Sequence, residues 1–159
     1  MTTQELLPLQ IPRLLWFNLI RTLRARGEGR RESGAFLLSR PRTRRVRAFV
    51  PYDDLDPHAL DKGYIHFADS GFVPLWKLCA MRGLSVIADV HTHPGQWTDL
   101  SGSDREHPMI AQGGHIALIV PSYAAMNSFG TEGVGAHLYL GSCEWESMEP
   151  SYLIHLKWL

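Results

Sequence analysis

The sequence predicts an α/β (α+β) fold in which a mixed β-sheet is flanked by helices. Apolar residues recur at helical spacing over residues 12–25, which indicates an amphipathic helix. Short apolar runs at residues 84–90 and 116–120 have the length and composition of buried strands. Because helices and strands are interspersed along the chain, we expect them to pack as layers around one sheet.

The elements follow in the order helix, two strands, helix, strand, polar loop, short helix and further strands. Pro12 suits the first turn of the first helix, and Gly27 with Gly29 is expected to end that helix. Gly83 is expected to end the second helix. The assigned ranges are helices at about 12–25, 70–81 and 103–111, strands at 33–39, 45–50, 84–90, 116–120, 135–140 and 152–156, and an acidic loop at 51–57.

Length and composition limit the class of protein. A chain of 159 residues fits one domain, so we expect residues 1–159 to form a single unit. The hydrophobic share of 45% and charged share of 20% are typical of soluble globular proteins. No apolar run approaches bilayer length and the first residues do not resemble a signal peptide, so we expect a cytoplasmic protein with no membrane partner. Cys79 and Cys143 are too few for a disulfide framework and are expected to be buried.

The net charge is zero, but the charges are unevenly distributed. Residues 1–50 contain eleven arginines and three acidic residues, whereas the remainder contains five basic and thirteen acidic residues. Such asymmetry fits either a nucleic-acid surface or a solvated face balanced by acids elsewhere in the domain. No nucleic-acid-binding motif or aromatic platform accompanies the arginines, so nucleic acid is not an expected partner.

The candidate chemistry lies in residues 91–104. Residues two apart in an extended segment project to the same face, so His91 and His93 can present their imidazoles to one ion. Pro94 starts a loop that can return Asp104 to this pair. Two histidines and one carboxylate are a set that binds catalytic zinc and leaves a fourth position for water.

A metal hydrolase also needs a base for the attacking water and a donor for the carbonyl oxygen. Glu32 and Ser101 are the candidates for these two roles. A His-x-His pair alone is weak evidence, because paired histidines on a strand are often structural. The added Pro94, Ser101 and Asp104 strengthen the metal hypothesis.

These residues resemble the motif of the JAMM metalloproteases, also called JAB or MPN-plus. That family has a glutamate and, far downstream, His-[Ser/Thr]-His-Pro followed by Ser-x-x-Asp, with seven residues counted from the proline to the residue before the serine. Glu32 follows the first predicted helix, as in the family, and the resemblance covers roughly residues 10–145. The matching segments are His91-Thr92-His93-Pro94 and Ser101-Gly102-Ser103-Asp104.

The resemblance implies the MPN/JAMM (cytidine-deaminase-like) fold and one Zn²⁺ per chain, held by His91, His93 and Asp104. It also implies that Glu32 holds the attacking water and shuttles its proton, while Ser101 donates to the carbonyl oxygen. All five residues are present, which argues against a relative that has lost catalysis. Family members often have glycine three residues after the glutamate, and this chain has alanine there.

The activity implied by the resemblance is hydrolysis after the tail of a ubiquitin or ubiquitin-like protein, as an isopeptidase or precursor-processing peptidase in a bacterial pathway. Its partners would be that protein or its conjugates, together with activating and conjugating enzymes. Two segments that are inserted in chain-recognising deubiquitinases are short here, at about residues 51–63 and 121–135. Two alternatives stay open: a peptidase acting on a sulfur-carrier adduct or other peptide, and a non-catalytic MPN binding module.

Two further side chains are weaker candidates. Trp97 either lines a substrate groove or packs within its loop. His107 is either a surface histidine or a residue that contacts a metal ligand. The remaining histidines are expected to lie at the surface or as paired core residues: His58, His66, His115, His137 and His155.

Overall fold

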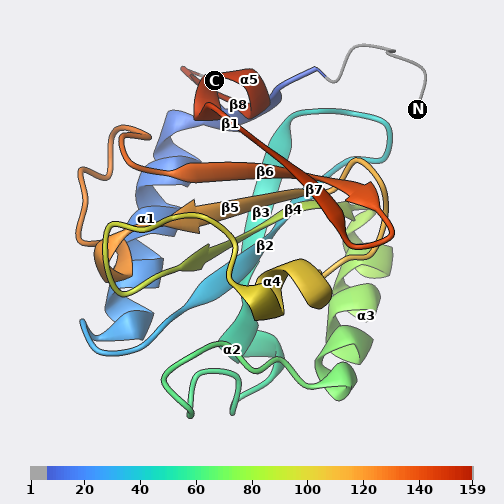
Figure 1. The fold of residues 1–159 in the computed structure, drawn as a ribbon. Helices are drawn as coiled ribbons and strands as arrows, with labels where there is room; N and C mark the ends of the chain where they lie inside the picture. The colour runs from blue at the N-terminus through green and yellow to red at the C-terminus, as the bar shows by residue number, and fades with distance from the viewer. Residues whose placement is uncertain (1–6, 159) are drawn as a thin grey trace.

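A mixed six-stranded sheet forms the centre of the computed structural model, which describes residues 7–158. Its strands lie in the order β3-β2-β4-β5-β6-β7, and a separate parallel pair joins β1 to β8 (Figure 1). Only β4 and β5 are parallel neighbours within the six-stranded sheet. The strands are β1 (Leu9–Pro12), β2 (Gly34–Ser39), β3 (Val46–Pro51), β4 (Ser85–Thr92), β5 (Ile116–Val120), β6 (Gly135–Gly141), β7 (Glu144–Met148) and β8 (Ile154–Lys157).

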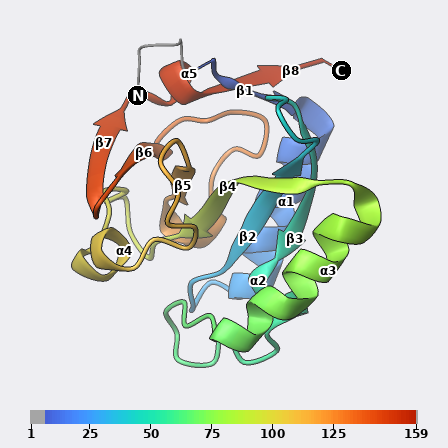
Figure 2. The same ribbon diagram turned by 90° about the vertical axis from the view of Figure 1, so that its right-hand side faces the viewer.

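The two long helices, α1 (Arg13–Gly27) and α3 (Phe72–Arg82), cover opposite faces of the sheet (Figures 1 and 2). Alternate side chains of β2 divide between the two resulting cores. Leu37 packs in the core that contains α1, and Phe36 packs in the core that contains α3. This arrangement confirms the predicted fold class. The short helices are α2 (Tyr52–Leu55), η1 (Asp69–Gly71), α4 (Gly102–Glu106), η2 (Ser122–Ala124) and α5 (Pro150–Leu153).

The ends of the long helices follow from backbone conformation. Gly83 caps α3 in the left-handed region at φ 63°, as its position predicted. In α1 the left-handed residue is Glu28, at φ 55°, whereas Gly27 is the last helical residue. The prediction that α1 ends at these glycines is therefore confirmed, although the left-handed capping residue is Glu28. Across residues 7–158, every helix is too short or too polar to cross a membrane.

The six predicted strands are confirmed to within two residues at each end, and four local details differ from the predictions. The acidic loop at 51–57 contains the helix α2. The strand predicted at 84–90 continues to Thr92, and the helix predicted at 103–111 ends at Glu106. The strand predicted at 152–156 begins as helix α5. Strands β1 and β7 were not predicted, and Cys143 is exposed, contrary to the prediction, whereas Cys79 is buried.

The site region lies where β2 and β4 run side by side. Gly34 pairs with His91 across these strands. A Cβ at Gly34 would overlap the ring of Tyr52 and lie 2.8 Å from the carbonyl oxygen of Val90. Glycine at this position therefore lets the Tyr52 side chain approach the strand that carries the histidines.

Candidate metal centre

His91, His93 and Asp104 come together at the end of β4 and the first turn of α4. The Nε2 atoms of the two histidines lie 3.3 Å apart. The Asp104 carboxylate lies 3.5 Å from Nε2 of His91 through one oxygen and 3.4 Å from Nε2 of His93 through the other. Both imidazoles are buried, while Asp104 is partly exposed. The structure thus groups the three residues that the sequence selected as ligands.

These distances match the requirements of a small divalent metal ion. A tetrahedral zinc ion with bonds of about 2.0–2.1 Å holds its ligand atoms about 3.3–3.4 Å apart. The separation of 3.3 Å between the two Nε2 atoms matches this value, and each Nε2 has one oxygen of Asp104 within 3.5 Å, a different oxygen for each ring. Two imidazole nitrogens and a carboxylate oxygen are also the atoms that zinc binds. The group can therefore hold a metal ion, and its chemistry fits zinc.

Ser101 and Asp104 are held together by helix capping. Ser101 is the N-cap of α4, and its Oγ accepts a hydrogen bond from the backbone N–H of Asp104 at 3.0 Å. The backbone N–H of Ser101 donates to Oδ2 of Asp104 at 2.8 Å. This reciprocal capping box fixes the carboxylate relative to the serine. Because Ser101 Oγ acts as an acceptor here, its own proton is available for another partner.

The charges of the cluster are strongly coupled. Burial alone would lower the pKa of His91, but the nearby carboxylates of Asp104 and Asp89 outweigh it and raise the pKa to about 10. Burial alone would raise the pKa of Asp104, but the two histidines hold it well below its usual range. The metal-free site therefore favours a protonated His91 beside an ionised Asp104. A metal ion that binds Nε2 of His91 must displace a proton.

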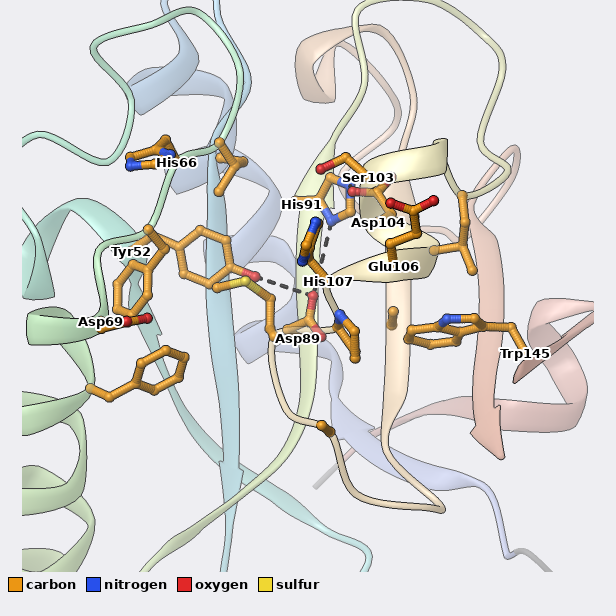
Figure 3. A pocket seen from close by; sticks show the side chains of 18 residues that line it. Tyr52, His66, Asp69, Asp89, His91, Ser103, Asp104, Glu106, His107 and Trp145 are labelled. Atoms are coloured by element: carbon orange, nitrogen blue, oxygen red, sulfur yellow. Dashed lines mark hydrogen bonds and ion pairs between the residues drawn. The ribbon is translucent and has the colours of Figure 1, made fainter. Parts of the chain in front are cut away.

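A second buried group lies beside His91. Asp89 accepts a hydrogen bond from the hydroxyl of Tyr52 at 3.1 Å and contacts Nε2 of His115 at 2.6 Å. Oδ2 of Asp89 lies 4.0 Å from Nδ1 of His91. Burial would raise the pKa of Asp89, but its two histidine neighbours lower it to about 2. Figure 3 shows these contacts between Tyr52, Asp89 and His91.

The loop between His93 and Asp104 contacts two histidine side chains, His93 and His137. The indole of Trp97 stacks on the imidazole of His93, and the carbonyl oxygen of Trp97 lies 3.0 Å from Nδ1 of that histidine. The carbonyl oxygen of Thr98 lies 2.9 Å from Nε2 of His137 on β6. Each carbonyl oxygen can accept a hydrogen bond from the N–H of its imidazole. The position of His93 therefore depends on its own loop and, through Thr98, on β6.

Glu32 is not part of the ligand group, and its chain neighbour pairs with the strand that carries the histidines. It precedes Ser33, whose backbone N–H donates to Oγ1 of Thr92 at 3.0 Å, between the two histidines. The carboxylate of Glu32 accepts a hydrogen bond from the backbone N–H of Ile65 at 3.3 Å. The carboxylate is thus held toward the segment that forms one side of the neighbouring pocket.

A pocket of about 640 Å³ opens next to the ligands (Figure 3). His91 and Asp104 contribute to its wall, so the candidate metal position is reached from this space. Most of the wall is aromatic or aliphatic, and among the described residues that line it none is lysine or arginine. The apolar and aromatic lining residues are Tyr52, Ile65, Phe67, Phe72, Leu100, Pro108, Met109, Ala111, Ala117 and Trp145.

The two weaker candidates, His107 and Trp97, both lie close to the candidate metal centre. His107 lines the pocket, while Trp97 is 59% exposed and contacts His93 directly. Asp89 was not predicted to be part of the site, because it lies within the apolar strand predicted at 84–90. One feature could have identified it: Asp89 lies two residues before His91 and therefore on the same face of the strand.

Comparison with known proteins gives a fold but no family. No family model matches the chain. The solution structure of a protein from Desulfitobacterium hafniense is similar, with a TM-score of 0.64 and 18% identity over 94% of this chain and 92% of that chain. A protein from Salinibacter ruber gives a TM-score of 0.55 and 16% identity over 92% and 90%. A JAB1/MPN domain protein from Archaeoglobus fulgidus gives 0.48 and 15% over 92% and 96%. The first two likenesses show a shared fold and leave the activity open.

Proposed function

We propose that the chain is a zinc-dependent peptidase of the JAMM type, which cleaves after the C-terminal tail of a ubiquitin-like protein. The observation that carries this proposal is the grouping of His91, His93 and Asp104, whose candidate ligand atoms, one from each residue, all lie within 4.8 Å of one another. This observation agrees with the motif resemblance, which implies the same three residues as ligands. Zinc bound there would polarise the substrate carbonyl and lower the pKa of a water molecule.

The protein's own groups would supply the proton transfers. Glu32 accepts the proton of the attacking water and delivers it to the leaving amine. Its carboxylate has one backbone partner, the N–H of Ile65, so it can still accept from a water molecule. The Ser101 hydroxyl, whose oxygen accepts a hydrogen bond from the backbone N–H of Asp104, donates a hydrogen bond to the developing oxyanion.

The charge of the pocket favours one of the open substrate classes. A peptidase that releases a free amino acid must accommodate an α-carboxylate beside the cleaved bond. Outside the proposed ligand group and the buried Asp89, the described acidic residues that line the pocket are Asp69 and Glu106, and no described lining residue is lysine or arginine. Such a wall disfavours a carboxylate and suits a lysine side chain or a following peptide as the leaving amine.

The decisive experiment is incubation of the purified, zinc-loaded protein with a ubiquitin-like protein encoded near its gene, fused through its tail to a reporter. Cleavage after the tail supports the proposal. A chain that binds zinc stoichiometrically, yet cleaves neither this fusion nor a lysine-linked conjugate, would instead fit the non-catalytic binding module.

A further inference from the structure

Asp89 forms a buried cluster with Tyr52, His115 and His91, which we call the Asp89 cluster. The carboxylate is 2% exposed, and none of its three neighbours is more than 7% exposed. A buried carboxylate is costly unless it is paired and hydrogen-bonded. The contacts to Tyr52 and His115 provide that compensation. The chain therefore retains an ionised group beneath the candidate metal centre, and the chemistry described so far gives it no role.

His91 lies between two carboxylates. Its Nε2 faces Asp104 at 3.5 Å, and its Nδ1 lies 4.0 Å from Oδ2 of Asp89. A histidine that binds metal through one nitrogen carries a proton on the other, and an acceptor for that proton fixes the ring orientation. A ring movement of about 1 Å would bring Nδ1 and Oδ2 to hydrogen-bond distance. Asp89 is thus placed on the side of His91 that lies away from Asp104.

The carboxylate is held in place from elements outside β4. The Tyr52 hydroxyl comes from α2, next to Gly34, where the absence of a Cβ leaves space for the tyrosine ring. His115 comes from the residue before β5 and contacts Oδ1, the other oxygen. Since Tyr52 donates one hydrogen bond to Oδ2, that oxygen keeps a lone pair for Nδ1–H of His91.

We infer that Asp89 is a positioning residue for the metal centre: it accepts a hydrogen bond from Nδ1–H of His91 and thereby directs the Nε2 lone pair of that ring toward the metal ion. This inference rests on the proposed zinc site. A purely structural explanation also exists, in which Asp89 only satisfies the polar atoms of Tyr52 and His115. The two explanations predict different zinc affinities for folded variants.

The test compares zinc affinity, by competition with a chelator, in the wild type, Asp89→Asn and Tyr52→Phe. An amide is a weaker acceptor than a carboxylate, so Asp89→Asn should bind zinc tenfold to a hundredfold more weakly, roughly the range for partners of ligand histidines. Tyr52→Phe removes one donor but keeps the carboxylate, so its zinc affinity should stay within about threefold of the wild type. Thermal unfolding of each metal-free protein separates loss of stability from loss of affinity.

A second measurement needs no variant. In the zinc-loaded wild type, ¹H–¹⁵N NMR of the His91 ring should show a proton on Nδ1 that exchanges slowly with water. An Nδ1 without a proton, or one whose proton exchanges as fast as that of an exposed histidine, would overturn the inference even if Asp89→Asn failed to fold.

The remaining outcomes separate this inference from the proposed function. Unchanged zinc affinity in folded Asp89→Asn, or equal weakening in Tyr52→Phe, would overturn the positioning role while the zinc site stood. A wild type that bound no zinc would overturn both the proposed function and the role of Asp89.

Discussion

The indole of Trp97 stacks on the imidazole of His93, with ring centroids 5.4 Å apart and an angle of 14° between the planes. A side chain that is 59% exposed therefore covers one face of a candidate metal ligand. Aromatic pairs of this kind contribute about 0.5–1.5 kcal/mol beyond their buried area. The stack should help to hold His93 in the orientation that the metal requires.

Replacing Trp97 with alanine should therefore weaken zinc binding by about twofold to tenfold, the equivalent of that energy. The measurement is chelator competition. Trp158→Ala is the matched control, because Trp158 is 85% exposed and packs against Arg13 instead of a ligand. Equal affinities for Trp97→Ala and the wild type would show that the stack is incidental.

Replacing Glu32 with glutamine should leave zinc binding intact and abolish turnover. The amide has nearly the shape of the carboxylate but cannot accept the proton of the attacking water. Loss of a general base lowers kcat by roughly a hundredfold or more. Zinc content and peptidase rate are measured on the same preparation. Activity within a few fold of the wild type would make Glu32 structural, and loss of zinc would make it a ligand.

Part of the candidate ligand group could be predicted from sequence because its geometry is local. His91 and His93 share a strand face, and the spacing of Ser101 and Asp104 is that of a helix capping box. The partners of Asp89 could not be predicted in this way. Tyr52 and His115 lie 37 and 26 residues away in sequence, and only the folded sheet brings them to one carboxylate.

The errors in the predicted secondary structure also arise from contacts and turns that the local sequence does not reveal. The acidic residues at the start of α2 resemble a loop in composition, but Asp53 and Asp54 both pair with Arg26, at 2.9 and 2.7 Å. Strand β7 follows a tight turn in which Ser142 and Cys143 have positive φ, at 52° and 59°. Such turns usually contain glycine or asparagine, so this sequence gives no recognisable hairpin motif.

Gly34→Ala should destabilise the protein, because the new Cβ would overlap the ring of Tyr52 and approach the Val90 carbonyl. Overpacking of this kind costs about 1–3 kcal/mol. For a chain of this size that corresponds to a decrease in Tm of roughly 2–12 °C. Thermal unfolding checks the value. Gly102→Ala is the control, since no atom lies within 4 Å of its added Cβ; an equal decrease in both variants would contradict the packing argument.

His137 should make the wild type less stable in acid. Burial lowers its pKa in the folded state, whereas the unfolded value is about 6.5. The neutral form is therefore favoured by folding, and stability should fall as the pH drops below about 6.5, until the folded pKa is passed. Denaturant unfolding between pH 8 and 5 should show a smaller loss in His137→Gln. His58→Gln should not reduce the loss of stability. Asp61 raises the pKa of His58, so protonation of His58 stabilises the folded state instead of destabilising it. A loss in His137→Gln equal to that of the wild type would contradict this prediction.

The last prediction concerns substrate selection under the proposed function. The segments that would read the group beyond the cleaved bond are short, so recognition should depend mainly on the tail that provides the carboxyl group. A Gly-Gly tail suits this site, because glycine lets the backbone pass close to a metal ion without side-chain clashes. A lysine side chain, a following peptide and a small reporter should therefore all be cleaved from one cognate tail. Changing the penultimate tail glycine to leucine should sharply reduce kcat/KM. Equal rates for the two tails would refute tail recognition, and cleavage of the lysine-linked form alone would show that the leaving side is also recognised.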